Sequence, residues 1–197
     1  MDRRRFAPAL VLYEEKSVVP SLRRAGVPVH VLPPLPDWLP DGRRNRLGRA
    51  VLRAREIFGV VAPRARVLHR LLRRERPDLV YLANGVPANI DALVAAALCG
   101  LPVISHEKGL RRIGPRERIM SRWIHTSIGM TRQVTEHVRA RGIRPRRQLT
   151  IYDGIDCAAF TPGGGAAVRR EFAIPPDAPV VGIVGHLQRW KGQLLVV

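Results

Sequence analysis

The chain has 197 residues, of which 46% are hydrophobic and 25% are charged, and its formal net charge is +18. This composition is typical of a globular protein, and the length allows one domain of about 100–200 residues plus part of a second. No apolar run reaches the ~18–20 residues of a membrane span, and residues 6–13 are too short for a signal peptide. We therefore expect neither an integral membrane protein nor a secreted one.

The two cysteines, Cys99 and Cys157, lie in no CxxC motif and near no cluster of histidines. This excludes a disulfide framework and a structural zinc site, and we expect free thiols in a reducing compartment. The basic residues are 31 Arg and 3 Lys. With the abundant Ala, Gly and Pro, this bias indicates a GC-rich coding sequence, which weakens the inference from net charge to nucleic-acid binding.

Strands and helices are predicted to alternate along the chain. Short apolar runs bounded by Gly or Pro predict strands at 7–13, 27–32, 79–83, 101–105, 125–129 and 149–152. Apolar residues at helical spacing predict helices at 17–25, 46–61, 63–75, 88–99, 115–123 and 131–141. Ser17 and Thr131 are the predicted N-caps of the first and last of these helices.

This alternation predicts an α/β fold with a Rossmann-like, doubly wound parallel sheet. Ligands of such sheets bind at the carboxyl ends of the strands. The loops after Ala83, Ser105, Gly129 and Tyr152 are therefore the places to look for a site, and we expect His106 to begin the second of these loops.

The end of the chain has a different organisation. Pro162-Gly163-Gly164-Gly165 is typical of a linker, and an apolar strand is predicted at 179–184. We divide the chain into a domain at 1–160, a linker at 161–178 and the first fragment of a second domain at 179–197.

Two motifs flank this linker. Residues 181–193 read VGIVGHLQRWKGQ, a strand, a glycine turn at Gly185 and a polar loop that contains Lys191. A glycine lets a ligand approach the backbone, and a lysine near a helix N-terminus attracts phosphate, although most such turns are structural. The second motif, residues 152–156, reads YDGID and by itself indicates only a turn.

Together, and in this order and spacing, the two motifs resemble the interdomain junction of the family 4 glycosyltransferases. The upstream segment at 73–109, which reads RRERPDLVYLANGVPANIDALVAAALCGLPVISHEKG, resembles the acceptor-side domain of that family. The resemblance implies one half of a GT-B architecture, in which two Rossmann-like domains face each other across a cleft. It also implies a retaining, metal-independent transfer from a UDP- or GDP-linked sugar to an acceptor hydroxyl, with no cofactor besides this nucleotide-sugar co-substrate.

The resemblance also implies roles for particular residues. Gly185, His186 and Lys191 occupy the positions that hold the donor diphosphate, with His186 where the family commonly has Arg. The family's second donor motif, E-x7-E, is expected beyond Val197. We therefore expect a fragment of a bacterial glycosyltransferase of polysaccharide or glycolipid biosynthesis, incomplete for catalysis by itself.

On the acceptor side, His106 occupies the position of a catalytic histidine that binds the donor sugar or the acceptor hydroxyl. Lys108 and Gly109 in the same loop, and Asn84 after the preceding strand, are candidate acceptor-binding residues. Two alternatives stay open from the residues alone: His106 is a loop histidine without a ligand, and Asn84-Gly85 is a turn.

Residues 41–76 contain 12 Arg and 3 acidic residues, a net charge of +9. On amphipathic helices these arginines predict a cationic face, which either is simply solvated or contacts an anionic membrane. Because the only aromatic residue in this stretch is Phe58, we expect no nucleic-acid partner.

The expected partners are a nucleotide-sugar and a saccharide or lipid-linked acceptor, in the cytoplasm or at the inner face of its membrane. The alternative functions are a non-catalytic Rossmann-like binding module and one half of a split enzyme.

Overall fold

A computed structural model describes residues 2–32, 57–159 and 163–196. The chain divides into two compact units, Met1–Asp153 and Gly154–Val197, each described here by itself. Of the predicted helix at 46–61, only its end lies among the described residues, where Ile57–Val61 form one π-helical turn, η1. Residues 41–56 of the arginine-rich stretch lie outside the described residues.

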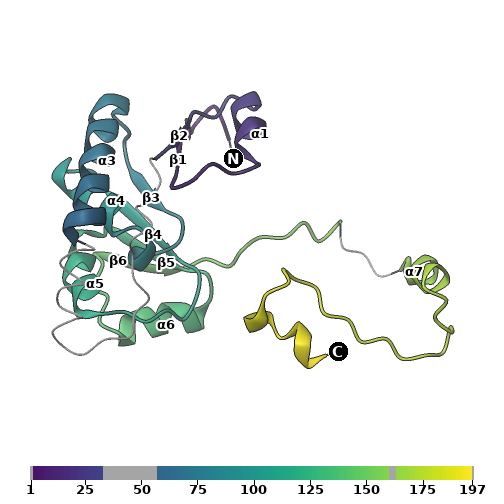
Figure 1. The fold of residues 1–197 in the computed structure, drawn as a ribbon. Helices are drawn as coiled ribbons and strands as arrows, with labels where there is room; N and C mark the ends of the chain where they lie inside the picture. The colour runs from purple at the N-terminus through teal and green to yellow at the C-terminus, as the bar shows by residue number, and fades with distance from the viewer. Residues whose placement is uncertain (1, 33–56, 160–162, 197) are drawn as a thin grey trace. The chain divides into compact units, whose positions relative to one another are not determined.

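The first unit alternates strands and helices (Figure 1). Its strands are β1 (Leu10–Leu12), β2 (Val29–Val31), β3 (Val80–Leu82), β4 (Val103–Glu107), β5 (Thr126–Gly129) and β6 (Arg147–Thr150). Its helices are α1 (Val19–Arg24), α3 (Ala62–Glu75), α4 (Ile90–Leu98), α5 (Pro115–Met120) and α6 (Arg132–Ala140), with short 3-10 turns η2 (Val86–Ala88) and η3 (Ser121–Trp123).

All described strand pairs are parallel, which confirms the predicted fold class. The strands form two sheets, one of β1 and β2 and one in the order β3-β4-β5-β6, where the prediction treated all six as one sheet. Val11 of β1 and Leu32, the residue after β2, belong to an apolar cluster with Leu68 of α3 and Ala95 of α4. Side-chain packing on these two helices therefore holds β1 and β2 in the unit.

The main core lies between the four-stranded sheet and α4. It contains seven buried residues: Leu82, Val86, Ile90, Leu93, Ala96, Val103 and Ile124. In β4 the alternation of side chains buries Val103, Ser105 and Glu107 on this face and leaves Ile104 and His106 partly exposed on the other.

Helix α6 covers the same buried face beside α4. The Thr131 hydroxyl accepts a hydrogen bond from the Val134 amide at 3.2 Å, which confirms the predicted N-cap. A Cβ at Gly129 would overlap Thr135, so a glycine at this position allows α6 to approach the sheet closely.

Three local predictions are wrong. Ser17 does not cap α1, because the helix begins two residues later beside Pro20, whose fixed φ suits the first turn. The last strand is Arg147–Thr150 rather than 149–152, in register with β5 from Thr126 onward. Strand β4 extends to Glu107, so His106 lies within a strand and not in the following loop.

The second unit contains α7 (Gly165–Glu171) and two 3-10 turns, η4 (Arg189–Lys191) and η5 (Gln193–Leu195). The Arg169 guanidinium donates to the carbonyl oxygens of Pro175 and Ala178 at 2.7 and 3.0 Å and so holds the turn after α7. The strand predicted at 179–184 is absent, because this segment has no strand beside it to pair with.

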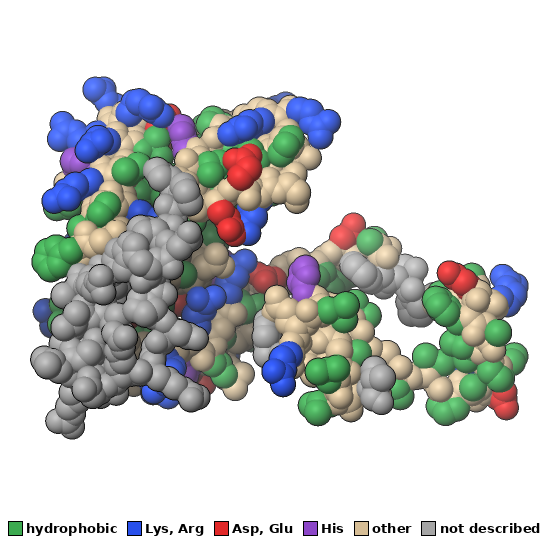
Figure 2. Space-filling model, viewed as in Figure 1, with side chains coloured by type: hydrophobic (Ala, Val, Ile, Leu, Met, Phe, Trp, Pro, Cys, Tyr) green, Lys and Arg blue, Asp and Glu red, His purple; other side chains and the backbone are tan. Residues whose placement is uncertain are grey.

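Hydrophobic side chains are exposed over much of the second unit (Figure 2). Among the residues that the structure describes, no helix is both long and apolar enough to cross a membrane.

Candidate functional site

The predicted acceptor-side residues follow two neighbouring parallel strands. β3 ends at Leu82 and β4 at Glu107, and Leu82 pairs with Ser105 in register. The carboxyl ends of both strands therefore meet at one edge of the sheet, where the loop after β3 carries Asn84. This is the edge at which parallel α/β sheets bind ligands.

His106 lies on the partly open face of this edge and is bound to Tyr81. The Tyr81 hydroxyl lies 2.5 Å from His106 Nδ1, and the two rings meet edge to face with centroids 6.0 Å apart. The other ring nitrogen, Nε2, is buried and has no hydrogen-bond partner among the described residues. The imidazole is thus hydrogen-bonded at Nδ1, and its Nε2 has no partner among the described residues.

Tyr81 was missed by sequence reasoning, since a tyrosine in an apolar strand usually indicates only β-propensity. Burial, and then the negative charge of Asp153, raise the pKa of the Tyr81 hydroxyl above its usual value. The phenol therefore keeps its proton at neutral pH. The alternation of side chains along a strand could have identified Tyr81. Once the register of β3 and β4 is known, this alternation places Tyr81 and His106 on the same face of the sheet.

Glu107, the next residue, is buried on the opposite face of β4. Its Oε1 accepts hydrogen bonds from the Ser105 hydroxyl at 2.6 Å and the Val86 amide at 3.4 Å. Gly85 has φ +73°, and a Cβ there would overlap the Glu107 carboxylate. Asn89 Nδ2 donates to the Gly85 carbonyl at 2.7 Å. These contacts fix the loop after β3 against the end of β4.

The other predicted acceptor-side residues make few contacts. Asn84 and Lys108 are exposed, and no side-chain hydrogen bond of either is found among the described residues. Gly109 is partly exposed, and a Cβ there would meet nothing within 4 Å. These residues lie at the same edge of the sheet as His106, but no described side-chain hydrogen bond connects them to it.

The predicted donor-binding residues Gly185, His186 and Lys191 lie in the second unit and are exposed. The His186 carbonyl accepts a hydrogen bond from Gln193 Nε2 at 2.9 Å, and the Lys191 amide donates to the Gln188 carbonyl at 2.8 Å. A Cβ at Gly185 would only reach ordinary contact with Gln193. The packing of this segment therefore does not require a glycine there.

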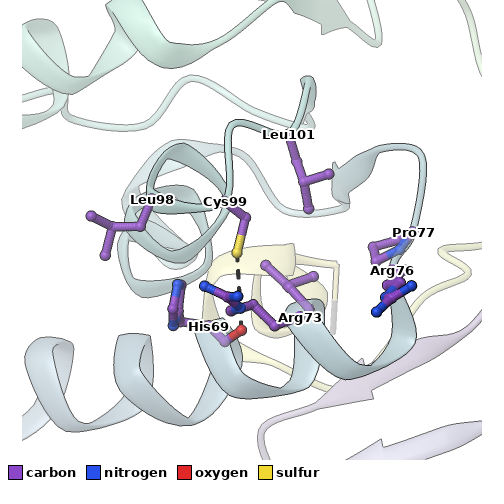
Figure 3. Close-up of a pocket in the computed structure, with 8 residues that line it drawn as sticks. His69, Arg73, Arg76, Pro77, Leu98, Cys99 and Leu101 are labelled. Atoms are coloured by element: carbon purple, nitrogen blue, oxygen red, sulfur yellow. Dashed lines mark hydrogen bonds between the residues drawn. The ribbon is translucent and has the colours of Figure 1, made fainter.

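A cavity of about 310 Å³ lies elsewhere, beside the C-terminal ends of α3 and α4 (Figure 3). It is lined by His69, Leu72, Arg73, Arg76, Pro77, Leu98, Cys99 and Leu101, and the Cys99 thiol donates to the His69 carbonyl at 3.9 Å. Arginines at a helix C-terminus stabilise the negative end of the helix dipole. Arg73 lies in the last turn of α3 and has this role, and none of the predicted site residues lines the cavity.

Among residues 2–32, 57–159 and 163–196, no three His, Cys, Asp or Glu side chains are grouped to hold a metal ion. Near this edge, the Tyr81 phenol and the Glu107 carboxylate are hydrogen-bonded within the unit, whereas His106 keeps one ring nitrogen without a partner among the described residues.

A parallel α/β unit with polar side chains at the carboxyl ends of adjacent strands defines a Rossmann-like domain, as found in each half of the GT-B transferases. Residues 16–159 match the sequence profile of Glycosyltransferase Family 4. The chain belongs to this family.

Similar solved structures have the same fold. A glycosyltransferase from Rickettsia africae superposes with a TM-score of 0.66 at 14% identity, over 98% of this chain and 48% of that protein. HepE from Anabaena, solved with UDP-glucose, superposes with a TM-score of 0.58 at 19% identity, over 95% of this chain and 47% of HepE. The chain thus spans about half the length of these structures.

Relatives in sequence are D-inositol 3-phosphate glycosyltransferases. The protein from Geodermatophilus obscurus is 34% identical over 76 residues, which are 39% of this chain and 16% of the relative. The protein from Mycobacteroides abscessus is 30% identical over 91 residues, which are 46% of this chain and 20% of the relative.

Proposed function

We propose that this chain is the acceptor-side half of a bacterial glycosyltransferase, followed by the first part of its donor-binding half. The reaction moves a sugar from a UDP- or GDP-linked donor to an acceptor hydroxyl, with retention of the anomeric configuration and without a metal ion. The observation that carries the proposal is the family match over residues 16–159, which includes the strand that presents His106. The neighbour HepE, solved with UDP-glucose, supports a nucleotide-sugar as the donor.

The proposed roles follow from the chemistry of the side chains. His106 offers a hydrogen bond to the donor sugar or the acceptor hydroxyl, and Asn84, Lys108 and Gly109 border the acceptor. In the second unit, the Lys191 ammonium and the His186 ring bind the diphosphate and stabilise the charge that develops on it as the glycosidic bond breaks. Gly185 lets the diphosphate approach the backbone.

The test is turnover with UDP- and GDP-linked hexoses and simple acceptor sugars, measured for this chain alone and with a donor-binding chain of the family added. Release of free nucleoside diphosphate above the rate of hydrolysis, unchanged by EDTA and lost in Lys191→Ala, is the expected result for an active protein. The anomeric configuration of the product, read by proton NMR, decides between retention and inversion. Dependence of the rate on added Mg²⁺ would contradict the metal-independent mechanism.

A second candidate is one half of a split enzyme, or a binding module without turnover. It is favoured by the family match, which covers residues 16–159 and does not include the predicted donor-binding residues Gly185, His186 and Lys191. Under this function the chain alone shows no turnover. If the chain is half of a split enzyme, adding a separate donor-binding chain of the family produces turnover. If the chain is a binding module, the mixture shows no turnover.

We also propose a cytoplasmic location with contact at the inner face of the membrane, where a lipid-linked acceptor would lie. The exposed side of α3 carries Arg66, Arg70, Arg73 and Arg74, and Figure 2 shows Lys and Arg side chains gathered over this part of the first unit. Each arginine near an anionic bilayer contributes about 1 kcal/mol of attraction. Sedimentation with phosphatidylglycerol vesicles, but not with phosphatidylcholine vesicles, is expected; equal sedimentation with both would contradict it.

A further inference from the structure

The structure pairs Tyr81 with His106 through the register of β3 and β4. Tyr81 lies opposite Ile104, so His106 stands two residues further along on the same face. The phenol oxygen and His106 Nδ1 are 2.5 Å apart. The edge-to-face ring contact fixes the plane of the imidazole as well as its position.

We propose that Tyr81 is a positioning residue for His106: its hydroxyl donates to Nδ1 and so holds the proton of the neutral imidazole on Nε2. The part of this inference that concerns the ligand of His106 rests on the proposed function. A ring nitrogen with a free lone pair is a better acceptor than a phenolic oxygen, which favours donation from Tyr81 over the reverse arrangement.

One further observation agrees with this direction of the hydrogen bond, and a second shows which nitrogen of His106 is left for a partner. The raised pKa of Tyr81, due to burial and then to the charge of Asp153, keeps the phenol protonated and therefore able to donate. His106 Nε2 is buried and unmatched among the described residues, and a buried polar group of this kind calls for a partner.

The tautomer decides which ligand His106 takes. With its proton on Nε2, the neutral ring is a hydrogen-bond donor at the only nitrogen left for a ligand. It binds an oxygen acceptor, such as a hydroxyl oxygen of the sugar, and it does not act as a general base toward an acceptor hydroxyl. The pairing with Tyr81 thus assigns a binding role to a residue whose type alone permits both roles.

The test is the nitrogen NMR spectrum of the chain labelled with ¹⁵N-histidine at a pH where the imidazoles are neutral. The chain has six histidines, and the His106 resonances are identified by their loss in His106→Gln. We expect an unprotonated Nδ1 and a protonated Nε2 in the wild-type protein. A protonated Nδ1, or an equal mixture of tautomers, would overturn the proposal, and this readout needs no variant at Tyr81.

The variant Tyr81→Phe keeps the ring and removes the hydroxyl, and the excess of the Nε2–H tautomer is expected to fall by up to about tenfold. Tyr152→Phe is the matched control, since Tyr152 is exposed and has no described side-chain partner. In this control variant the tautomer ratio of His106 should equal that of the wild-type protein. An unchanged ratio in Tyr81→Phe, or an equal change in both variants, would overturn the positioning role.

These outcomes are separate from the proposed function. The NMR readout needs no substrate, so a confirmed tautomer in a chain that shows no turnover even with a donor-binding chain added refutes the catalytic role and leaves the pairing intact. Turnover with the opposite tautomer refutes the pairing and leaves the proposed reaction intact.

Discussion

The last two residues of β4 face opposite sides of the sheet and have opposite environments. Glu107 points to the buried face, where its carboxylate is hydrogen-bonded by Ser105 and Val86 and is covered by Gly85. His106 points to the partly open face, where Tyr81 binds one ring nitrogen and the other has no partner among the described residues. Adjacent residues of one strand therefore differ in their contacts: Glu107 fixes the loop after β3, whereas His106 keeps one ring nitrogen without a partner among the described residues.

The largest expected effect is on the Glu107 side. Gly85→Val places a branched side chain at φ +73° and against the Glu107 carboxylate, so the free energy of unfolding should fall by about 3 kcal/mol or more. Urea denaturation measures the change. Gly109→Ala is the control, because a Cβ at Gly109 meets nothing within 4 Å, and it should change stability by less than about 0.5 kcal/mol. Equal losses in both variants would show that the Gly85 contact is not specific.

Removing the carboxylate should have a smaller effect. Glu107→Ala leaves the Ser105 hydroxyl without its acceptor on the buried face, and we expect a loss of about 2 kcal/mol in the free energy of unfolding. Glu107→Gln keeps an oxygen acceptor and should lose less. If Gln and Ala cost the same, the hydrogen bonds to Glu107 do not stabilise the loop.

Stability should also fall at alkaline pH. The pKa of Tyr13 is raised by burial and then by Asp91, to which its hydroxyl donates a hydrogen bond at 2.8 Å. The folded-state pKa lies above the unfolded value of about 10. The protonated Tyr13 hydroxyl therefore contributes fully to the free energy of unfolding below about pH 10, and this contribution is lost as pH rises. The expected slope is up to about 1.4 kcal/mol per pH unit above pH 10. The slope should be reduced in Tyr13→Phe, and an unchanged slope in that variant would assign the alkaline loss to other groups.

The smallest stability effect is expected at His106. His106→Gln removes one hydrogen bond on a partly open face, so the free energy of unfolding should change by less than about 1 kcal/mol. Under the proposed function the same variant should lower kcat/KM by up to about tenfold, which corresponds to the loss of one neutral hydrogen bond. A stability loss as large as that of Glu107→Ala would mean that the two faces of β4 do not differ in the way the structure indicates.

The family resemblance at 73–109 was found in the sequence and is confirmed by the match over residues 16–159, whereas the junction motif at 181–193 lies outside this match. The assignments of Gly185, His186 and Lys191 to the donor stay predictions, as do those of Asn84, Lys108 and Gly109 to the acceptor. Their side chains are largely exposed or make few contacts, so local structure does not test them.

The order and type of most elements in the first unit are local properties, and the sequence alone determined them. Helical spacing of apolar residues marks α3, α4 and α6, and the side chain of Thr131 caps α6 within one turn of its own position. The strand predicted at 179–184 failed for the converse reason. A strand requires hydrogen bonds from a neighbouring strand, and apolar residues alone do not supply them.

The contacts that define the candidate site depend on residues distant in the sequence, and only the tertiary structure decided them. Tyr81 is 25 residues from His106, and Val86 is 21 residues from Glu107. Each pair meets because β3 and β4 lie parallel in one particular register, and a shift of one residue would turn every side chain of β4 to the opposite face. Local pattern therefore specifies which segments become strands, whereas register specifies that His106 faces Tyr81 and Glu107 faces Gly85.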